Sequence, residues 1–159
     1  MITVRLADAA DWERIWPIWH GVVAAGTTYM WDPATRYEQA RALWMSGEVF
    51  VAVEGDEVVG TALLKPNQPG LGDHVANAGF MVDPSRAGRG IGRALATAVL
   101  DHARSGGYTG MQFNAVISTN TGAVALWRSL GFEVVATIPG GFRHATLGRV
   151  PIHIMYRDL

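Results

Sequence analysis

The spacing of hydrophobic residues changes several times along the chain, and each change predicts a new element. Residues 2–7 alternate between apolar and polar positions, as a half-buried strand does, and the following apolar residues recur at helical spacing. Further on, two alternating segments flank a Gly-Asp pair, which predicts a hairpin. The elements predicted for this half are a strand at 2–7, a helix beginning at Asp8 or Asp11, an aromatic-rich loop at 26–33, a helix at 35–45, and strands at 48–54 and 57–65.

The second half of the chain alternates between strand and helix patterns. Its last helix pattern is followed by Gly131, a residue type that commonly ends helices. The elements predicted here are a loop at 66–73, a strand at 74–82, a helix at 90–104, a strand at 110–116, a helix at 120–132, and strands at 133–138 and 150–157 separated by a glycine-flanked loop at 140–148. The whole pattern predicts one mixed α/β domain over residues 1–159. Four tryptophans at helical spacing are expected in its core: Trp12, Trp16, Trp19 and Trp44.

Composition narrows the classes of function. Hydrophobic residues make up 49% and charged residues 17% of the chain, which fits a folded globular protein. The formal net charge is −1, so no overall basic field is available to bind nucleic acid. The chain has no cysteine, which excludes disulfides and thiolate metal sites, and no segment resembles a signal peptide or a membrane span. We therefore expect a cytoplasmic protein with neither nucleic-acid nor membrane partners.

The segment VDPSRAGRGIGRAL, residues 82–95, carries the strongest chemical signal. Its three alternating glycines, the first of them Gly88, follow a predicted strand and open a predicted helix. Glycines let the backbone approach a ligand closely, and the amides of a first helical turn lack intrahelical partners, so this layout favours phosphate binding. Two common phosphate motifs do not fit. The dinucleotide fingerprint needs a glycine where Arg93 stands, and the Walker loop needs a lysine, whereas Lys65 is the only lysine of the chain.

The same segment resembles the acyl-CoA pyrophosphate loop of the GCN5-related N-acetyltransferase (GNAT) superfamily, usually Q/R-x-x-G-x-G/A. Gly90 and Gly92 match, while Ala87 stands where the pattern has Gln or Arg. Residues 120–132 are similar to the second signature, N-x-x-A-x-x-L-Y-x-x-x-G-F, with Trp127 in place of the tyrosine. The resemblance implies a central mixed, mostly antiparallel sheet flanked by helices, with acetyl-CoA as co-substrate and no metal. The cofactor-binding residues that it implies are Val82, Ala87, Gly88, Arg89, Gly90, Ile91, Gly92, Arg93 and Asn120.

The resemblance also implies direct transfer of an acetyl group from acetyl-CoA to an amine. The thioester oxygen then needs a hydrogen-bond donor, for which the backbone N–H of Met81 or Val82 is the local candidate. Members of the superfamily often carry a glutamate base in the region of Asn77, and their tyrosine acid corresponds to Trp127. Neither side chain transfers protons. The titratable residues nearby are at positions 73–74. We expect positioning to supply most of the catalysis, with water removing the proton of the amine.

A closer likeness covers the C-terminal half of the chain. The segment from Asn77 to residue 139 is similar to the fungal N-acetyltransferases of proline analogues such as azetidine-2-carboxylate. By that likeness Asn77 and Asn114 face the acceptor, and Asn120 faces the cofactor. The segment TTYMWDP resembles phosphinothricin-type acetyltransferases, and its Tyr29 and Trp31 are candidates to line the acceptor pocket. Both likenesses imply a small amino-acid-like amine as substrate.

Other assignments stay open at this stage. An acetyltransferase of protein amino groups fits the same motifs and would need an open acceptor groove. A non-catalytic acyl-CoA-binding module fits the missing glutamate and tyrosine. The resemblance also allows a homodimer. Arg143 and His144, in the glycine-flanked loop, are candidates to contact CoA or an acceptor carboxylate, and a solvated hairpin loop is the simpler alternative.

Overall fold

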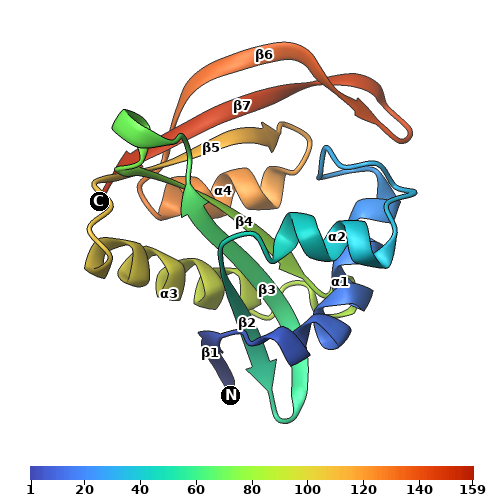
Figure 1. Ribbon diagram of the computed structural model, residues 1–159. Coiled ribbons are helices and arrows are strands. Elements are labelled where there is room, and N and C mark those ends of the chain that lie inside the picture. The colour runs from blue at the N-terminus through green and yellow to red at the C-terminus, as the bar shows by residue number, and fades with distance from the viewer.

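One seven-stranded sheet forms the centre of the molecule (Figure 1). The computed structural model describes residues 1–159. The strand order is β1-β2-β3-β4-β5-β7-β6, and every neighbouring pair is antiparallel except β4 and β5. The strands are β1 (Ile2–Leu6), β2 (Glu48–Glu54), β3 (Glu57–Pro66), β4 (Val75–Val82), β5 (Gly110–Ile117), β6 (Glu133–His144) and β7 (Gly148–Asp158). The predicted mixed, mostly antiparallel sheet is confirmed.

Helices cover both faces of this sheet. They are α1 (Trp12–Ala25), α2 (Tyr37–Trp44), α3 (Ile91–Ser105) and α4 (Thr121–Ser129). A core of 18 buried residues joins α3 and α4 to one face, and a second of 11 buried residues joins α1 and α2 to the other (Figure 1). Of the tryptophans expected in the core, Trp12, Trp19 and Trp44 are buried and Trp16 is partly buried. No helix combines the length and the apolar character that crossing a membrane requires.

The end of α4 shows how the local sequence shapes the fold. Gly131 adopts a left-handed conformation with φ of +88°, and its amide donates to the Arg128 carbonyl at 3.0 Å. The next amide, of Phe132, donates to the Trp127 carbonyl, also at 3.0 Å. This pair of bonds is a Schellman motif, which satisfies carbonyls that a helix end leaves without partners. The role predicted for Gly131 is confirmed, and Phe132 is placed in the larger core.

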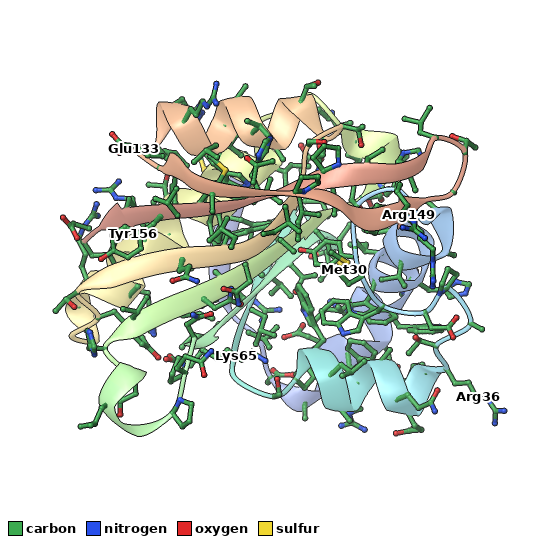
Figure 2. The ribbon with its side chains drawn as sticks, turned by 90° about the horizontal axis from the view of Figure 1, so that it is seen from above. Met30, Arg36, Lys65, Glu133, Arg149 and Tyr156 are labelled. Atoms are coloured by element: carbon green, nitrogen blue, oxygen red, sulfur yellow. The ribbon has the colours of Figure 1, made fainter.

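The last hairpin differs from the prediction. β6 continues to His144 and β7 begins at Gly148, so most of the predicted loop at 140–148 is strand. Phe142 packs with Val150 in a small buried cluster, and this burial outweighs the low strand propensity of the glycines beside it. A register shift just before Phe142 absorbs the extra residues. Figure 2 shows this hairpin from above, with Arg149 near its turn.

Candidate functional site

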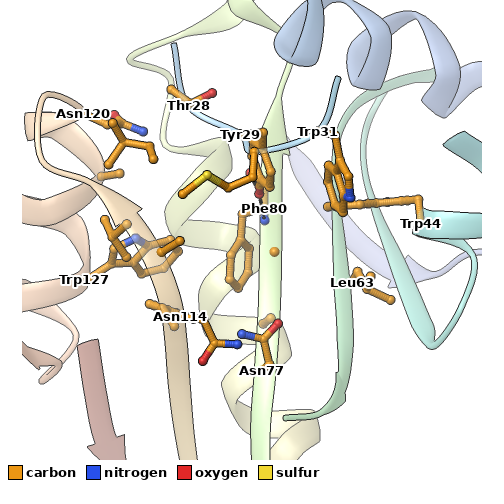
Figure 3. A pocket seen from close by; sticks show the side chains of 18 of the residues that line it. Thr28, Tyr29, Trp31, Trp44, Leu63, Asn77, Phe80, Asn114, Asn120 and Trp127 are labelled. Atoms are coloured by element: carbon orange, nitrogen blue, oxygen red, sulfur yellow. Dashed lines mark hydrogen bonds between the residues drawn. The ribbon is translucent and has the colours of Figure 1, made fainter. Parts of the chain in front are cut away.

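The two parallel strands, β4 and β5, diverge along their length. Their pairing is limited to Val75 with Gly110 and Ala76 with Met111. Beyond these residues a largely apolar cavity of about 330 Å³ lies between the strands. Figure 3 shows its walls, which come from the 26–33 loop, α2, β3, β4, β5 and α4 with the residue before it. Because the ladder is open here, those backbone groups of β4 that find no other partner in the protein are available to a ligand.

The ladder between β3 and β4 decides which amides face this opening. At one end the Asp83 amide donates to a β3 carbonyl at 2.9 Å, and at the other the Val75 carbonyl accepts from the residue after β3 at 2.8 Å. The odd-numbered residues of β4 therefore bond to β3, and the even-numbered ones face β5. Of the two amides proposed from the sequence, that of Met81 belongs to the β3 set, whereas that of Val82 is directed toward β5. The Met81 side chain is buried in the core beneath α1 and α2.

Tyr29 joins the 26–33 loop to β4 inside the cavity. Its hydroxyl donates to the Phe80 carbonyl and accepts from the Phe80 amide, both at 2.8 Å. Burial raises the pKa of this phenol, so the hydroxyl stays protonated at neutral pH. The ring stacks on Trp31 with centroids 5.3 Å apart, and Trp31 meets Trp44 edge-on. The two loop aromatics predicted for the acceptor pocket thus form a fixed wall of the cavity.

Three asparagine side chains line the same cavity (Figure 3). Asn77 on β4 donates from Nδ2 to the Gln112 carbonyl of β5 at 2.9 Å, which leaves its Oδ1 without a protein partner. Asn114 on β5 donates to the Asn67 Oδ1 at 2.7 Å and accepts from the Gln112 Nε2 at 3.0 Å. Asn120 occupies the N-cap position of α4, yet its side chain makes no capping bond. The structure therefore brings together the three asparagines that the sequence marked from separate segments.

The cavity lining contains neither a carboxylate nor an imidazole. None of its lining residues is an aspartate, a glutamate or a histidine, and the two titratable ones are Tyr29 and Lys65. The residues at positions 73–74, considered from the sequence as proton acceptors, are exposed and lie outside the lining. Trp127 lines the cavity, and its indole packs on the Phe113 ring with the ring centroids 4.7 Å apart. The site offers hydrogen bonds and apolar contact, and no evident general base.

The glycine segment leads from this cleft to the start of α3. Gly88 and Gly90 have φ of +78° and +80°, and a side chain added at either would meet no neighbouring atom. Gly90 is the N-cap residue of α3, and no side chain caps the amides of the first turn. Such amides, at the positive end of the helix dipole, favour an anion. Ile91 turns its side chain into the core, so only its backbone is available there. The predicted segment 87–93 is therefore a continuous backbone surface.

The arginines beside this surface are not equally available. Arg86 is held by three carboxylates: those of Glu54, at 2.6 Å, Glu57, and Asp83, at 3.9 Å. Arg89 is exposed and approaches Glu54 at 3.3 Å. Arg93 is exposed and donates to a serine hydroxyl of α4 at 2.9 Å. The backbone and these two exposed arginines are the groups that a phosphate could reach, while Arg86 fastens the segment to the β2–β3 hairpin.

Several wall residues were not predicted. Phe80 and Phe113 face the cavity from β4 and β5, and Lys65 lines it from β3. Alternation along a strand does not reveal such residues, because both faces of a strand border the opening where two strands part. Gly79 is a second omission. An added Cβ there would lie 3.2 Å from the Trp44 ring and 3.3 Å from the Tyr29 hydroxyl, so this glycine makes room for the aromatic wall.

Sequence comparisons identify the family of the chain and several of its relatives. The sequence model described as the acetyltransferase (GNAT) family matches residues 11–132. The N-acetyltransferase aca1 of Schizosaccharomyces pombe is 43% identical over 101 residues, which are 64% of this chain and 46% of that protein. The chain thus spans about half the length of this fungal relative. The L-methionine sulfoximine/L-methionine sulfone acetyltransferase of Salmonella typhimurium is 30% identical over 152 residues, which cover 87% of this chain and 84% of that protein.

Solved structures give the same result. A GCN5-related N-acetyltransferase from Kribbella flavida is 49% identical and superposes with a TM-score of 0.95, over 99% of this chain and 98% of that one. The yncA protein of Salmonella typhimurium, solved with its cofactor acetyl-CoA, is 29% identical with a TM-score of 0.83, over 100% of this chain and 94% of that one. From its fold, its glycine segment and these matches, the chain belongs to the acetyltransferase (GNAT) family.

Proposed function

We propose that this protein transfers the acetyl group of acetyl-CoA to the amine of a small amino-acid-like acceptor while both substrates are bound. One observation carries the proposal. The open amides of segment 87–93 begin just past the end of β4, where that strand has already parted from β5. A ligand with a diphosphate and a long thioester arm fits this continuous path, with its reactive end at the cavity.

Acetyl-CoA would be held mainly by backbone groups. The amides of segment 87–93 would bond the diphosphate, and Arg89 and Arg93 would add charge to it. The side-chain amide of Asn120 makes no capping hydrogen bond to α4 and lies on the cavity wall, so it would bond the pantetheine arm. The acetyl-CoA in the Salmonella yncA structure supports this donor.

The reaction is an acyl substitution. The amine nitrogen attacks the thioester carbon, the C–N bond forms, the C–S bond breaks, and CoA leaves as a thiolate. The Val82 amide would bond the carbonyl oxygen as negative charge develops on it, because the Met81 amide is engaged with β3 and the Phe80 amide with Tyr29. Thiols ionise near pH 8.5, so the thiolate can leave without a proton from Trp127. Water would take the proton of the amine, since no carboxylate or imidazole lines the cavity.

The acceptor would occupy the part of the cavity between the aromatic wall and the asparagines. Tyr29 and Trp31 close one side, and Asn77 and Asn114 present amide groups on the other. A cavity of about 330 Å³ suits an amino-acid-sized molecule better than a protein segment. The free Oδ1 of Asn77 can accept a hydrogen bond from the attacking amine. The substrate named for the Salmonella sulfoximine acetyltransferase supports an acceptor of this kind.

Release of CoA thiol from acetyl-CoA, measured over a range of pH with small amines, tests the proposal. The panel would include common amino acids, methionine sulfoximine, azetidine-2-carboxylate and phosphinothricin, with N-terminal peptides as the competing class. Turnover of one small amine, with an equal amount of its N-acetyl product, is expected. Turnover of peptides alone would instead establish a protein acetyltransferase.

The second candidate is a non-catalytic acyl-CoA-binding module. The observation that favours it is the absence of a carboxylate or imidazole from the cavity lining. Tight binding of acetyl-CoA with no thiol release on any amine or peptide would establish this module and exclude the transferase.

A further inference from the structure

A second cavity lies on the other side of the aromatic wall. It has a volume of about 610 Å³ and is bordered by the 26–33 loop and the β6–β7 hairpin. Three loop residues, Tyr29, Met30 and Trp31, line both this cavity and the one between β4 and β5. The two cavities therefore adjoin, and a molecule bound in the first can extend past this wall toward the hairpin.

Two arginines of the hairpin line the second cavity. Arg143 on β6 and Arg149 on β7 are directly opposite each other in the strand register, so their side chains leave the same face of the hairpin. Like charges in this position repel and destabilise a hairpin. Neither guanidinium has a carboxylate within ion-pair distance, in contrast to Arg5 and Arg86. The pair is an unneutralised positive site.

The acidic residue that lines the same cavity does not neutralise these arginines. Asp32 is the one carboxylate that lines the second cavity, and its Oδ1 accepts a hydrogen bond from the Ala34 amide at 2.8 Å. This bond turns the carboxylate toward its own loop, and no ion pair forms with Arg143 or Arg149. The cavity keeps a net positive charge.

The hairpin that carries the arginines is fixed against the 26–33 loop. The Ala145 amide in its turn donates to the Gly26 carbonyl at the end of α1, at 3.0 Å. His144, which was a candidate ligand from the sequence, ends β6 and stabilises the turn, because its Nδ1 accepts from the amides of Thr146 and Leu147, both at 3.2 Å. The two neighbouring residues therefore differ in role: His144 stabilises the turn, and Arg143 lines the cavity.

We propose that Arg143 and Arg149 bind a carboxylate, or a similar oxyanion, on the end of the acceptor remote from its amine. Two guanidinium groups on one face can each donate paired hydrogen bonds to a carboxylate, and the bound anion would relieve their repulsion. The inference rests on the proposed function and deepens it. The acceptor would be an amino compound whose acidic group passes the wall formed by Tyr29, Met30 and Trp31.

A binding experiment tests the site without requiring turnover. Thermal unfolding of the wild type and of the double variant Arg143→Gln/Arg149→Gln would be followed with glutarate and, as the neutral isostere, glutaramide, at constant ionic strength. Glutarate at ten times its Kd is expected to raise the wild-type Tm by about 3–5 °C, and to leave the double variant unchanged. Arg128→Gln, which removes an exposed arginine of α4, should behave as the wild type. The double variant loses a repulsive pair, so it should fold.

Kinetics on an accepted amine complete the test. Replacing the carboxylate of that acceptor by its primary amide should raise KM at least tenfold in the wild type and little in the double variant. Arg143→Lys/Arg149→Lys should keep part of the preference, because it keeps the charge but loses the paired bonds. The KM for acetyl-CoA should stay constant in all variants.

Three results would overturn the site. The first is a glutarate shift of equal size in the wild type and the double variant. The second is no shift in either. The third is a raised KM for acetyl-CoA in the double variant, which would place the arginines on the cofactor. If no amine or peptide is turned over, the proposed function fails, and the glutarate experiment still decides whether the arginine pair binds a carboxylate.

Discussion

The donor half and the acceptor half that we propose for this site differ in the groups that form them. The donor half is a run of backbone amides from one continuous segment, 87–93, with an uncapped helix behind it. The acceptor half is assembled from side chains of at least four segments, including the 26–33 loop, β4, β5 and the β6–β7 hairpin. A backbone site keeps its shape through many side-chain changes, whereas a side-chain site changes with each of them. If these assignments hold, the backbone segment 87–93 conserves the binding of the donor, while side-chain changes can alter the acceptor.

The largest effect should come from blocking the donor backbone. Gly90→Asp places a carboxylate on the amides that the diphosphate needs, so it should raise the KM for acetyl-CoA about 100-fold or more. Gly55→Asp is the matched control, because Gly55 also has a positive φ, of +61°, with open space around it, in the β2–β3 turn. Both variants should lose similar stability in thermal unfolding. Equal KM values for acetyl-CoA in the two variants would show that segment 87–93 does not bind the donor.

A smaller effect is expected on the acceptor side at Asn77. Asn77→Ala removes the bond to the Gln112 carbonyl and the free Oδ1 that faces the cavity, so kcat/KM for the amine should fall about 10- to 50-fold. The KM for acetyl-CoA should change less than twofold. The measurement is initial velocity with each substrate varied in turn. A change confined to acetyl-CoA would place Asn77 in the donor half instead.

Tyr29→Phe should reduce activity with the amine less than Asn77→Ala does. The change removes both hydrogen bonds to Phe80, and it should cost about 1–3 kcal/mol of unfolding free energy and raise the KM for the amine about three- to tenfold. Tyr37→Phe is the control, since Tyr37 packs against Trp12 and Trp16 and its hydroxyl makes no hydrogen bond within the protein. Urea unfolding and amine kinetics on both variants measure the difference. Identical behaviour of the two variants would remove the proposed role of the loop as a fixed wall.

The smallest effect on activity should come from Asp11, at the base of α1. The hydrogen bonds from Arg5 hold the pKa of Asp11 below its usual value, and burial opposes them more weakly. A lowered pKa in the folded state stabilises the protein above the unfolded pKa, near 4, and the contribution is lost as the pH falls through the folded value. Asp11→Asn should therefore cost about 1–2 kcal/mol at pH 7, with kcat unchanged.

Unfolding of the wild type and Asp11→Asn between pH 7 and pH 3 measures this contribution. The difference in unfolding free energy should shrink below about pH 4, because the unfolded wild-type chain then binds a proton at Asp11 that the folded chain binds only at a lower pH. A difference that stays constant down to pH 3 would contradict the ion pair as its source.

The contrast between the halves also explains what the sequence could predict. Gly88, Gly90 and Gly92 could be proposed as donor-binding residues because a backbone site needs residues without side chains, and all three lie in one short segment. The role proposed for Arg149 could not be predicted in this way, since it depends on a hairpin register that extends through the predicted loop at 140–148. The role of Phe80 depends on where β4 and β5 part, which no local pattern encodes.

A crystal structure with CoA and the N-acetylated form of the best acceptor tests the central claim most directly. We expect the diphosphate on the amides of segment 87–93, the pantetheine arm between β4 and β5, and the product carbonyl within hydrogen-bond distance of the Val82 amide. The new amide nitrogen should lie beside Asn77, and the acidic end of the product should reach Arg143 and Arg149. A diphosphate bound away from α3, or a product outside the cleft between β4 and β5, would contradict the account.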